Sequence, residues 1–188
     1  MARRREDRFA NWDEFALELS KLVSNREVPR AAEAAVLDSE RYTLLRSLEF
    51  FAGFSDVELW EVVHRARWER HEVGHALYRK GGRGNTFHII AEGSVGVYRN
   101  EFKVAEMGPG NSVGEMAYLA PNPEMAVNSA DVIVATPATT ISFTPDSLRQ
   151  LGLATRSMFD RAFINVLVRR LHTAWQTLDR IPRAPASP

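Results

Sequence analysis

The sequence predicts an α+β protein in which an antiparallel, jelly-roll-like β-roll has helices before and after it. Three observations predict this class. Short segments with alternating apolar and polar residues occupy about residues 67–143, and glycine recurs between them, as turns between short antiparallel strands require. Two helix-capping signals precede this region. A long apolar stripe with helical spacing follows it.

The first 38 residues are predicted to form a helical appendage. Asn11-Trp12-Asp13-Glu14 has the spacing of a capping box, and the apolar residues that follow recur with helical spacing. A helix is therefore expected at about residues 12–24. Pro29 interrupts this pattern, and the alanine-rich residues 33–36 favour a helix again.

The main domain is expected to cover residues 39–180, and it starts with helices. A second capping box, Ser55-Asp56-Val57-Glu58, predicts the beginning of a helix with one apolar face. Phe50, Phe51 and Phe54 precede this helix. Large aromatic side chains beside a helix that must bury one face are expected to pack in the core.

The middle region has the period of half-buried strands and two clear turns. Phe87, Ile89 and Ala91 alternate with other residues, which predicts a strand with one buried face. The glycine-rich residues 81–84 lack the Gly-Lys-Ser/Thr ending of a phosphate-binding P-loop, so they are predicted to be a turn. Residues 99–101 are predicted to form the tip of a hairpin.

Two helices and a proline-rich tail are predicted at the end of the chain. Thr144 is a good N-cap and Pro145 suits the first helical position, so a short helix is expected there. A longer helix is predicted at about residues 155–180, and Pro182 ends it within the tail at residues 181–188.

The long C-terminal helix has an apolar stripe with three open interpretations. The stripe covers the chain's own roll, closes a ligand pocket as a lid, or pairs with a second copy in a homodimer. A heptad-like spacing favours pairing, but it covers only about two heptads. The stripe consists of Phe159, Phe163, Val166, Leu167, Leu171, Ala174, Trp175 and Leu178, and the heptad-like set of Ile164, Leu167, Leu171, Ala174 and Leu178.

The segment Val113-Gly114-Glu115-Met116-Ala117-Tyr118-Leu119 joins the β-rich region to a short helix. It resembles the phosphate-binding cassette of the cyclic nucleotide-binding domain, a sensor module of catabolite-activator-type regulators, kinase regulatory subunits and some channels. Residues 81–98 resemble the family's glycine-punctuated loop and following hairpin, and Met107-Gly108-Pro109-Gly110 resembles its turn before the cassette. The resemblance covers about residues 39–180.

The resemblance implies a ligand site for cAMP or cGMP. Glu115 would hold the ribose hydroxyl, and backbone N–H groups from Glu115 to Ala117 would face the phosphate. Asn128 and Ser129 would stand in for the family's arginine and its small neighbour. The predicted ligand-binding residues are Gly114, Glu115, Met116, Ala117, Asn128 and Ser129.

The chain departs from the family where the phosphate would bind. The family has the pattern Arg-small-Ala-x-Val, and this chain has Asn128-Ser129-Ala130-Asp131-Val132 when aligned backward from the next strand. Counting forward from Glu115 places Glu124 at the arginine position instead. Neither alignment supplies an arginine. A lost charge-assisted contact costs about 1.5–3 kcal/mol, so weak or absent cyclic nucleotide binding is expected.

Other charged residues bear on this expectation. Glu115, Glu124 and Asp131 would oppose an anion if they faced the same pocket. The upstream cations Arg79, Lys80 and Arg83 are candidates to compensate for the missing arginine.

Composition bounds the remaining choices. With 188 residues, of which 45% are hydrophobic, one main core is expected. Lys plus Arg equals Asp plus Glu at 24 each, so no net charge draws the chain to DNA or to an anionic membrane. The absence of cysteine excludes disulfides and thiol chemistry. No run approaches the ~20 apolar residues of a membrane span, and a cytoplasmic protein is expected.

Enzymatic and metal-binding signals are weak. His71 and His75 lie in a segment with strand character, where positions four apart are ~13 Å apart, so a shared metal ion is not expected. There is no Gly-x-Ser-x-Gly elbow, and the carboxylates are dispersed. A metal-dependent, cupin-like enzyme is the third-ranked hypothesis.

The sequence therefore predicts a non-enzymatic regulatory protein. It would bind cyclic nucleotide weakly, or a related ligand, and signal through its C-terminal helix to a protein effector. The alternative is a degenerate fold that binds no nucleotide and acts as a protein–protein interaction module. Only ten residues follow Leu178, too few for a helix-turn-helix domain, so DNA binding is not expected. The chain is either a stand-alone regulator or a sensor domain from a larger polypeptide.

Overall fold

A computed structural model of the chain describes residues 30–122 and 124–179. The chain divides into two compact units, Met1–Glu40 and Arg41–Pro188. The sheet, the cavity described below and all helices that follow α2 belong to the second unit. The helix predicted at residues 12–24 and the tail at residues 181–188 lie outside the described residues.

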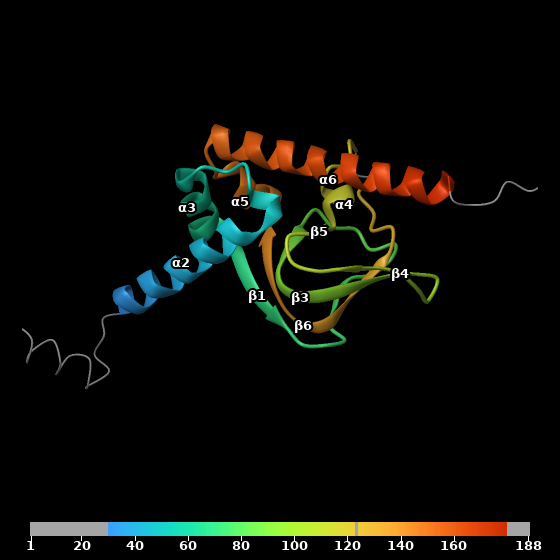
Figure 1. Ribbon diagram of the computed structural model, residues 1–188, viewed down its shortest axis with the longest axis horizontal. Coiled ribbons are helices and arrows are strands. Elements are labelled where there is room, and N and C mark those ends of the chain that lie inside the picture. Colours follow the sequence, from blue (N-terminus) through green and yellow to red (C-terminus); the bar gives the residue numbers. More distant parts are fainter. Residues whose placement is uncertain (1–29, 123, 180–188) are drawn as a thin grey trace, which may run out of the picture. The chain divides into compact units, whose positions relative to one another are not determined.

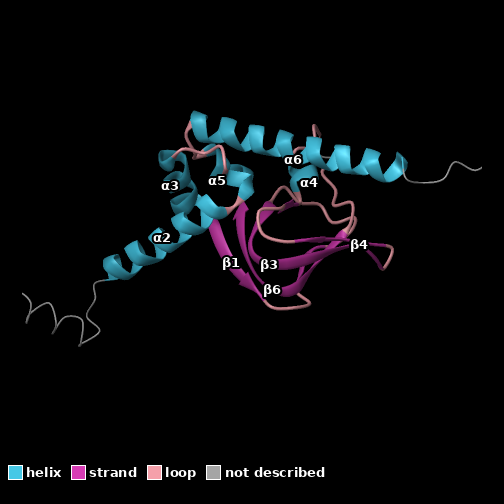
Figure 2. Cartoon of the chain, viewed as in Figure 1, coloured by secondary structure: helices cyan, strands magenta, loops and turns pink. Residues whose placement is uncertain are grey.

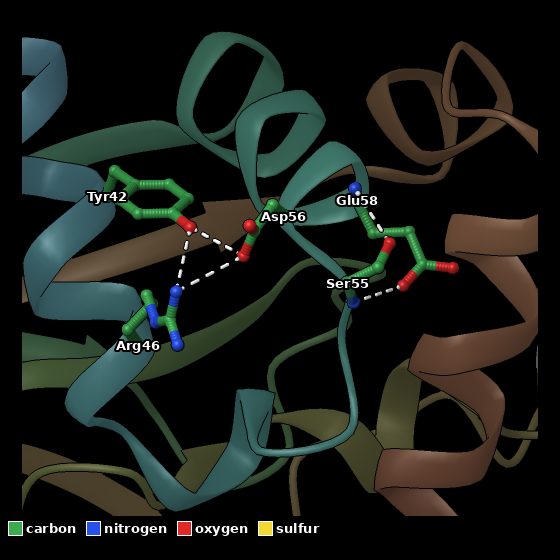
Figure 3. Close-up of polar contacts among 5 residues, drawn as sticks. All are labelled: Tyr42, Arg46, Ser55, Asp56 and Glu58. Atoms are coloured by element: carbon green, nitrogen blue, oxygen red, sulfur yellow. Dashed lines mark hydrogen bonds and ion pairs between the residues drawn. The ribbon is translucent and has the colours of Figure 1, made fainter.

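From residue 30 on, where the description begins, three helices precede the sheet: α2 (Arg30–Ser47), the 3-10 helix η2 (Glu49–Phe51) and α3 (Asp56–Arg65) (Figure 1). The predicted capping box at the start of α3 is confirmed. The Ser55 N–H donates to Glu58 Oε2 at 2.6 Å, and Ser55 Oγ accepts from the Glu58 N–H at 3.5 Å (Figure 3). The Tyr42 hydroxyl donates to Asp56 Oδ1 at 2.6 Å, which ties the end of α2 to α3 (Figure 3).

Six antiparallel strands form one sheet, in the order β1-β6-β3-β4, with β2 paired to β6 and β5 paired to β3. Figure 2 shows β3 and β6 as long, curved strands. Register shifts near Glu92 and Ser94 bend this central pair. The predicted α+β class with an antiparallel roll is confirmed. The strands are β1 (Arg67–His71), β2 (Ala76–Tyr78), β3 (Phe87–Arg99), β4 (Phe102–Met107), β5 (Ser112–Val113) and β6 (Asp131–Phe143).

The predicted hairpin tip connects β3 to β4. Arg99 pairs with Phe102, and the two residues between them, Asn100 and Glu101, have φ values of 49° and 68°. Two consecutive left-handed residues match the right-handed twist of the flanking strands. The end of β3 is therefore held in a tight, defined turn.

An aromatic cluster forms the main core of the second unit. Phe50, Phe51 and Phe54 are 3%, 2% and 9% exposed, which confirms their predicted place in the core. They contact Phe159 and Phe163 of the C-terminal helix, with ring centroids 5.3–6.2 Å apart for the pairs with Phe159 and 5.4 Å for Phe50 with Phe163. These pairs attach the helix to the segment that precedes the roll, and Phe87 of β3 and Phe143 of β6 attach it to the roll itself, with ring centroids 6.0 and 4.9 Å from that of Phe159.

The last two helices are α5 (Pro145–Arg149) and α6 (Leu153–Asp179). Thr144 caps α5 as predicted, since its Oγ1 accepts from the Ser147 N–H at 3.2 Å. The Glu61 carboxylate of α3 accepts from the Gly152 N–H and from the Thr155 hydroxyl, which fixes the start of α6. Among the described helices, none is long and apolar enough to cross a bilayer.

The two halves of α6 differ in burial. Phe159, Phe163 and Val166 are buried against the aromatic cluster. Beyond Val166, no side chain whose exposure is described, up to Gln176, is buried. Packing on the roll therefore explains the first half of the predicted stripe only.

Candidate functional site

The segment that resembles a phosphate-binding cassette folds as an open turn followed by a short helix. Gly114 follows β5 with φ 82°, a left-handed conformation, and α4 (Glu115–Tyr118) begins at once. A Cβ atom on Gly114 would lie 2.3 Å from Tyr78 Oη. Glycine is thus required here both for its backbone conformation and for the space that Tyr78 occupies.

A cavity of about 230 Å³ lies beside this turn, and all six predicted ligand-binding residues line it. The structure brings together the cassette and the Asn128–Ser129 segment, which lie in different loops. Their role in binding stays a prediction. The lining residues are Tyr78, Val97, Arg99, Met107, Val113, Gly114, Glu115, Met116, Ala117, Val127, Asn128, Ser129, Ala130, Val132 and Arg170.

Backbone pairing with the glycine-rich loop holds Asn128 at the cavity. The Asn128 N–H donates to the Gly82 carbonyl, and the Gly81 N–H donates to the Asn128 carbonyl, each at 2.9 Å. Asn128 Nδ2 lies 3.5 Å from where a Cβ atom of Gly82 would be. Glu124, the candidate from the other alignment, does not line the cavity. Of the two candidates for the arginine position, Asn128 therefore lines the cavity and Glu124 does not.

The Glu115 side chain is buried and already has partners. It is 2% exposed and forms an ion pair with Arg170 of α6. Arg170 also donates from Nη2 to the Ser112 carbonyl at 2.5 Å, and the Ser112 hydroxyl is 3.4 Å from Glu115 Oε2. Figure 1 shows α6 passing beside α4. A charged hydrogen bond therefore connects the cassette to the C-terminal helix.

Sequence reasoning missed Arg170, although a signal for it was present. Phe163 and Val166 are buried, and Arg170 follows them at helical spacings of seven and four residues. Residues at these spacings share one face of a helix, so Arg170 continues the face that contacts the roll. A cation on an otherwise apolar inner face indicates a buried acid opposite it.

Of the three carboxylates expected to oppose an anion, only Glu115 lines the cavity. Asp131 accepts a hydrogen bond from the Lys80 N–H at 2.9 Å and does not line it. The proposed compensating cations, Arg79, Lys80 and Arg83, do not line the cavity either. Lys80 Nζ instead donates to Asn100 Oδ1 at 2.8 Å. Of these candidate charges, the structure therefore places only Glu115 in the cavity lining.

Tyr78 and His88 form a polar contact beneath the cassette. The Tyr78 hydroxyl donates to the Thr86 carbonyl at 2.8 Å and lies 2.6 Å from His88 Nδ1. Burial raises the pKa of Tyr78, and the nearby Glu115 carboxylate raises it further. Burial, with a smaller contribution from His71, lowers the pKa of His88 to about 4. Both groups are therefore neutral at pH 7.

The histidine geometry corrects one prediction. The His71 and His75 rings stack with centroids 4.9 Å apart, not ~13 Å as continuous strand geometry predicts. The reason is that β1 ends at His71 and a turn interrupts the strand before β2 continues along β6: the His75 N–H donates to the Glu72 carbonyl at 3.1 Å, and Gly74 has φ 86°. Within residues 30–122 and 124–179, no group of three or more potential ligands is arranged to hold a metal ion.

Comparisons with known proteins agree with this geometry. A family model described as the cyclic nucleotide-binding domain matches residues 68–154. The fold is similar to that of a cyclic nucleotide-binding domain from Methylobacillus flagellatus, with a TM-score of 0.65 and 19% identity over 81% of this chain and 89% of that chain.

Two protein kinase regulators are also similar. The regulatory subunit of a cAMP-independent protein kinase A from Trypanosoma brucei has 27% identity and a TM-score of 0.58, over 73% of this chain and 46% of that one. The regulatory domain of Toxoplasma gondii PKA, solved with cAMP, has 21% identity and a TM-score of 0.55, over 68% and 50%. The present chain thus spans about half of either regulator. Residues 68–154 match the cyclic nucleotide-binding domain family, and the roll with its flanking helices has the fold of solved domains of that family.

Proposed function

We propose that the chain is a non-enzymatic regulatory module that binds cyclic nucleotide weakly, or a related ligand, in the cavity beside α4. It signals ligand occupancy through α6 to a protein partner. The observation that carries this proposal is the contact between Arg170 of α6 and Glu115 of the cassette. The Glu115 carboxylate belongs to a residue that lines the cavity, and it also forms the ion pair with α6.

The lining of the cavity suits a nucleoside with a weakly held phosphate. Glu115 has two oxygens, so its carboxylate can accept from a ribose hydroxyl and from Arg170 together. Val97, Met107 and Val132 provide an apolar wall for a base. Asn128 and Ser129 offer an amide and a hydroxyl to a phosphate, in place of a guanidinium. The missing charge-assisted bond is worth roughly 1.5–3 kcal/mol, or about 10- to 150-fold in affinity.

Occupancy reaches α6 through the shared carboxylate. A ligand hydroxyl on Glu115 changes how strongly that carboxylate holds Arg170, and Arg170 holds the second half of α6. Ligand binding shifts the position of a helix only if the ligand binds one arrangement better than the other. The sign of the coupling therefore depends on whether hydroxyl and guanidinium compete for Glu115 or share it.

The outer face of α6 is the surface that we propose for the partner. Ile164, Val168, Leu171 and Trp175 are 60%, 60%, 50% and 58% exposed and follow one another at spacings of four and three residues. The flanking positions include uncharged Asn165 and Ala174, and Asp160 and Arg161 one turn before Ile164 carry opposite charges. The apolar face thus has no excess of one charge beside it, so a second copy of the chain is the first candidate partner.

The test is a calorimetric titration of cAMP and of cGMP, up to millimolar concentration, into the wild type, Asn128→Arg and Asn85→Arg. Asn85 is exposed and does not line the cavity, so its variant adds the same charge elsewhere. We expect weak wild-type binding, at least about tenfold tighter binding by Asn128→Arg, and no gain by Asn85→Arg. No binding by either wild type or Asn128→Arg would instead support a fold that binds no nucleotide.

A further inference from the structure

After ion pairing is taken into account, the side chains that line the cavity carry a net positive charge. Three residues that line it carry charged side chains: Arg99, Glu115 and Arg170. Glu115 and Arg170 form an ion pair and neutralise each other. The cavity therefore retains one positive charge, that of Arg99, although position 128 has no arginine.

The strand places Arg99 on the cavity wall. Val95 and Val97 precede it at spacings of two residues, so the three side chains lie on one face of β3. Val95 is fully buried, and Val97 lines the cavity. The hairpin pair between Arg99 and Phe102 fixes the end of the strand. Arg99 thus follows the apolar residues of β3 on the side that lines the cavity, and its side chain is exposed to solvent.

Neighbouring polar groups do not neutralise Arg99. Asp131, which faces Tyr98 in the sheet, accepts from the Lys80 N–H instead. Asn100 accepts from the Lys80 ammonium. Among the described residues, the Arg99 side chain takes part in none of the ion pairs or hydrogen bonds of the structure. Its guanidinium donors are available to a ligand.

We propose that Arg99 binds the anionic group of the ligand and so replaces, from another strand, the arginine that is missing at position 128. This inference rests on the proposed function and names a specificity-determining residue for it. A guanidinium offers a planar fork of donors that matches phosphate oxygens. Asn128 and Ser129 line the same cavity and supply neutral donors for the remaining oxygens.

The test compares a charged with a neutral probe. Calorimetry measures binding of cAMP and of adenosine, which lacks the phosphate, to the wild type, Arg99→Gln and Arg83→Gln. Arg83 is the matched control: it is exposed, its backbone bridges to Val127 beside Asn128, and it does not line the cavity. Glutamine retains a polar side chain without the charge.

We expect Arg99→Gln to weaken cAMP binding by about tenfold and to leave adenosine binding unchanged. Arg83→Gln should bind both probes as the wild type does. Unchanged cAMP binding by Arg99→Gln overturns the inference, and so does an equal loss for both probes, because that would assign Arg99 to the nucleoside instead of the phosphate. A wild type that binds neither probe overturns the proposed function itself, and the inference with it.

Discussion

The two halves of α6 differ in what holds them. The first half, up to Val166, buries aromatic and aliphatic side chains against the core and is tied to α3 by Glu61. The second half is held through the polar groups of Arg169 and Arg170, which pair with Glu49 of η2 and Glu115 of α4. Apolar burial anchors one half, whereas charges hold the other. Charged contacts exchange readily with ligand groups, so regulation is expected in the second half.

The largest effect is expected from removing the anchor. Phe163→Ala should lower the free energy of unfolding by about 3–5 kcal/mol, because Phe163 is 1% exposed within the aromatic cluster. The matched change Leu171→Ala, on the second half, should cost no more than about 0.5 kcal/mol at low protein concentration. Urea denaturation of both variants measures this difference. Equal losses of unfolding free energy in the two variants would contradict the claim that only the first half of α6 is anchored by apolar burial.

Acid should weaken the roll to which the anchored half is attached. The pKa of His88 in the folded state is about 4, against an ordinary value of 6.5. The unfolded chain binds this proton first as the pH falls, so stability is retained above pH 6.5 and lost towards pH 4. The loss is at most about 3 kcal/mol. Unfolding free energies measured from pH 7 to pH 4 should show this slope, and His88→Gln should remove it.

The polar hold on the second half is the next target. Arg170→Gln leaves the Glu115 carboxylate, which is 2% exposed, without its guanidinium and should cost about 1–3 kcal/mol. Arg161→Gln, an exposed change on the first half, should cost almost nothing. A double-mutant cycle with Glu115→Gln should give a favourable coupling energy, and additive losses would show that the two side chains do not interact in solution.

The smallest change in stability is expected at the outer face of α6. Leu171→Glu should change the free energy of unfolding by no more than about 0.5 kcal/mol, because Leu171 is 50% exposed. It should, however, prevent self-association, because it places two like charges opposite each other in an apolar seam. Sedimentation equilibrium of the wild type and the variant measures this. A wild type that is monomeric at high concentration would favour a different protein as the partner.

Most of the fold was predictable because local signals specify it. The capping residues Ser55 and Thr144 mark helix starts, and strand alternation marks the roll, so both kinds of element follow from short stretches of sequence. The cassette likewise depends on a local requirement, a glycine at position 114. These features need no knowledge of distant contacts.

The site features that were not predicted depend on contacts between distant segments. Whether Arg170 meets Glu115 depends on where α6 lies on the roll, and whether Arg99 or Arg83 lines the cavity depends on how β3 and β6 curve. The distance between His71 and His75 was wrong because a strand end was treated as continuous strand. Residue spacing determines which side chains share a face of one element, but not what that face meets.

The geometry of α6 also has a mechanical consequence. Val166 is the last buried residue among those of α6 whose exposure is described, and Trp175 lies roughly 13 Å farther along the helix axis, at about 1.5 Å per residue. The second half of α6 thus acts as a lever arm: the aromatic cluster is its pivot, and the exposed Trp175 side chain lies near its free end. A tilt of about 10° moves Trp175 by roughly 2 Å. Arg170 lies between the pivot and the free end, so a sub-ångström adjustment at Glu115 is amplified where a partner would detect it.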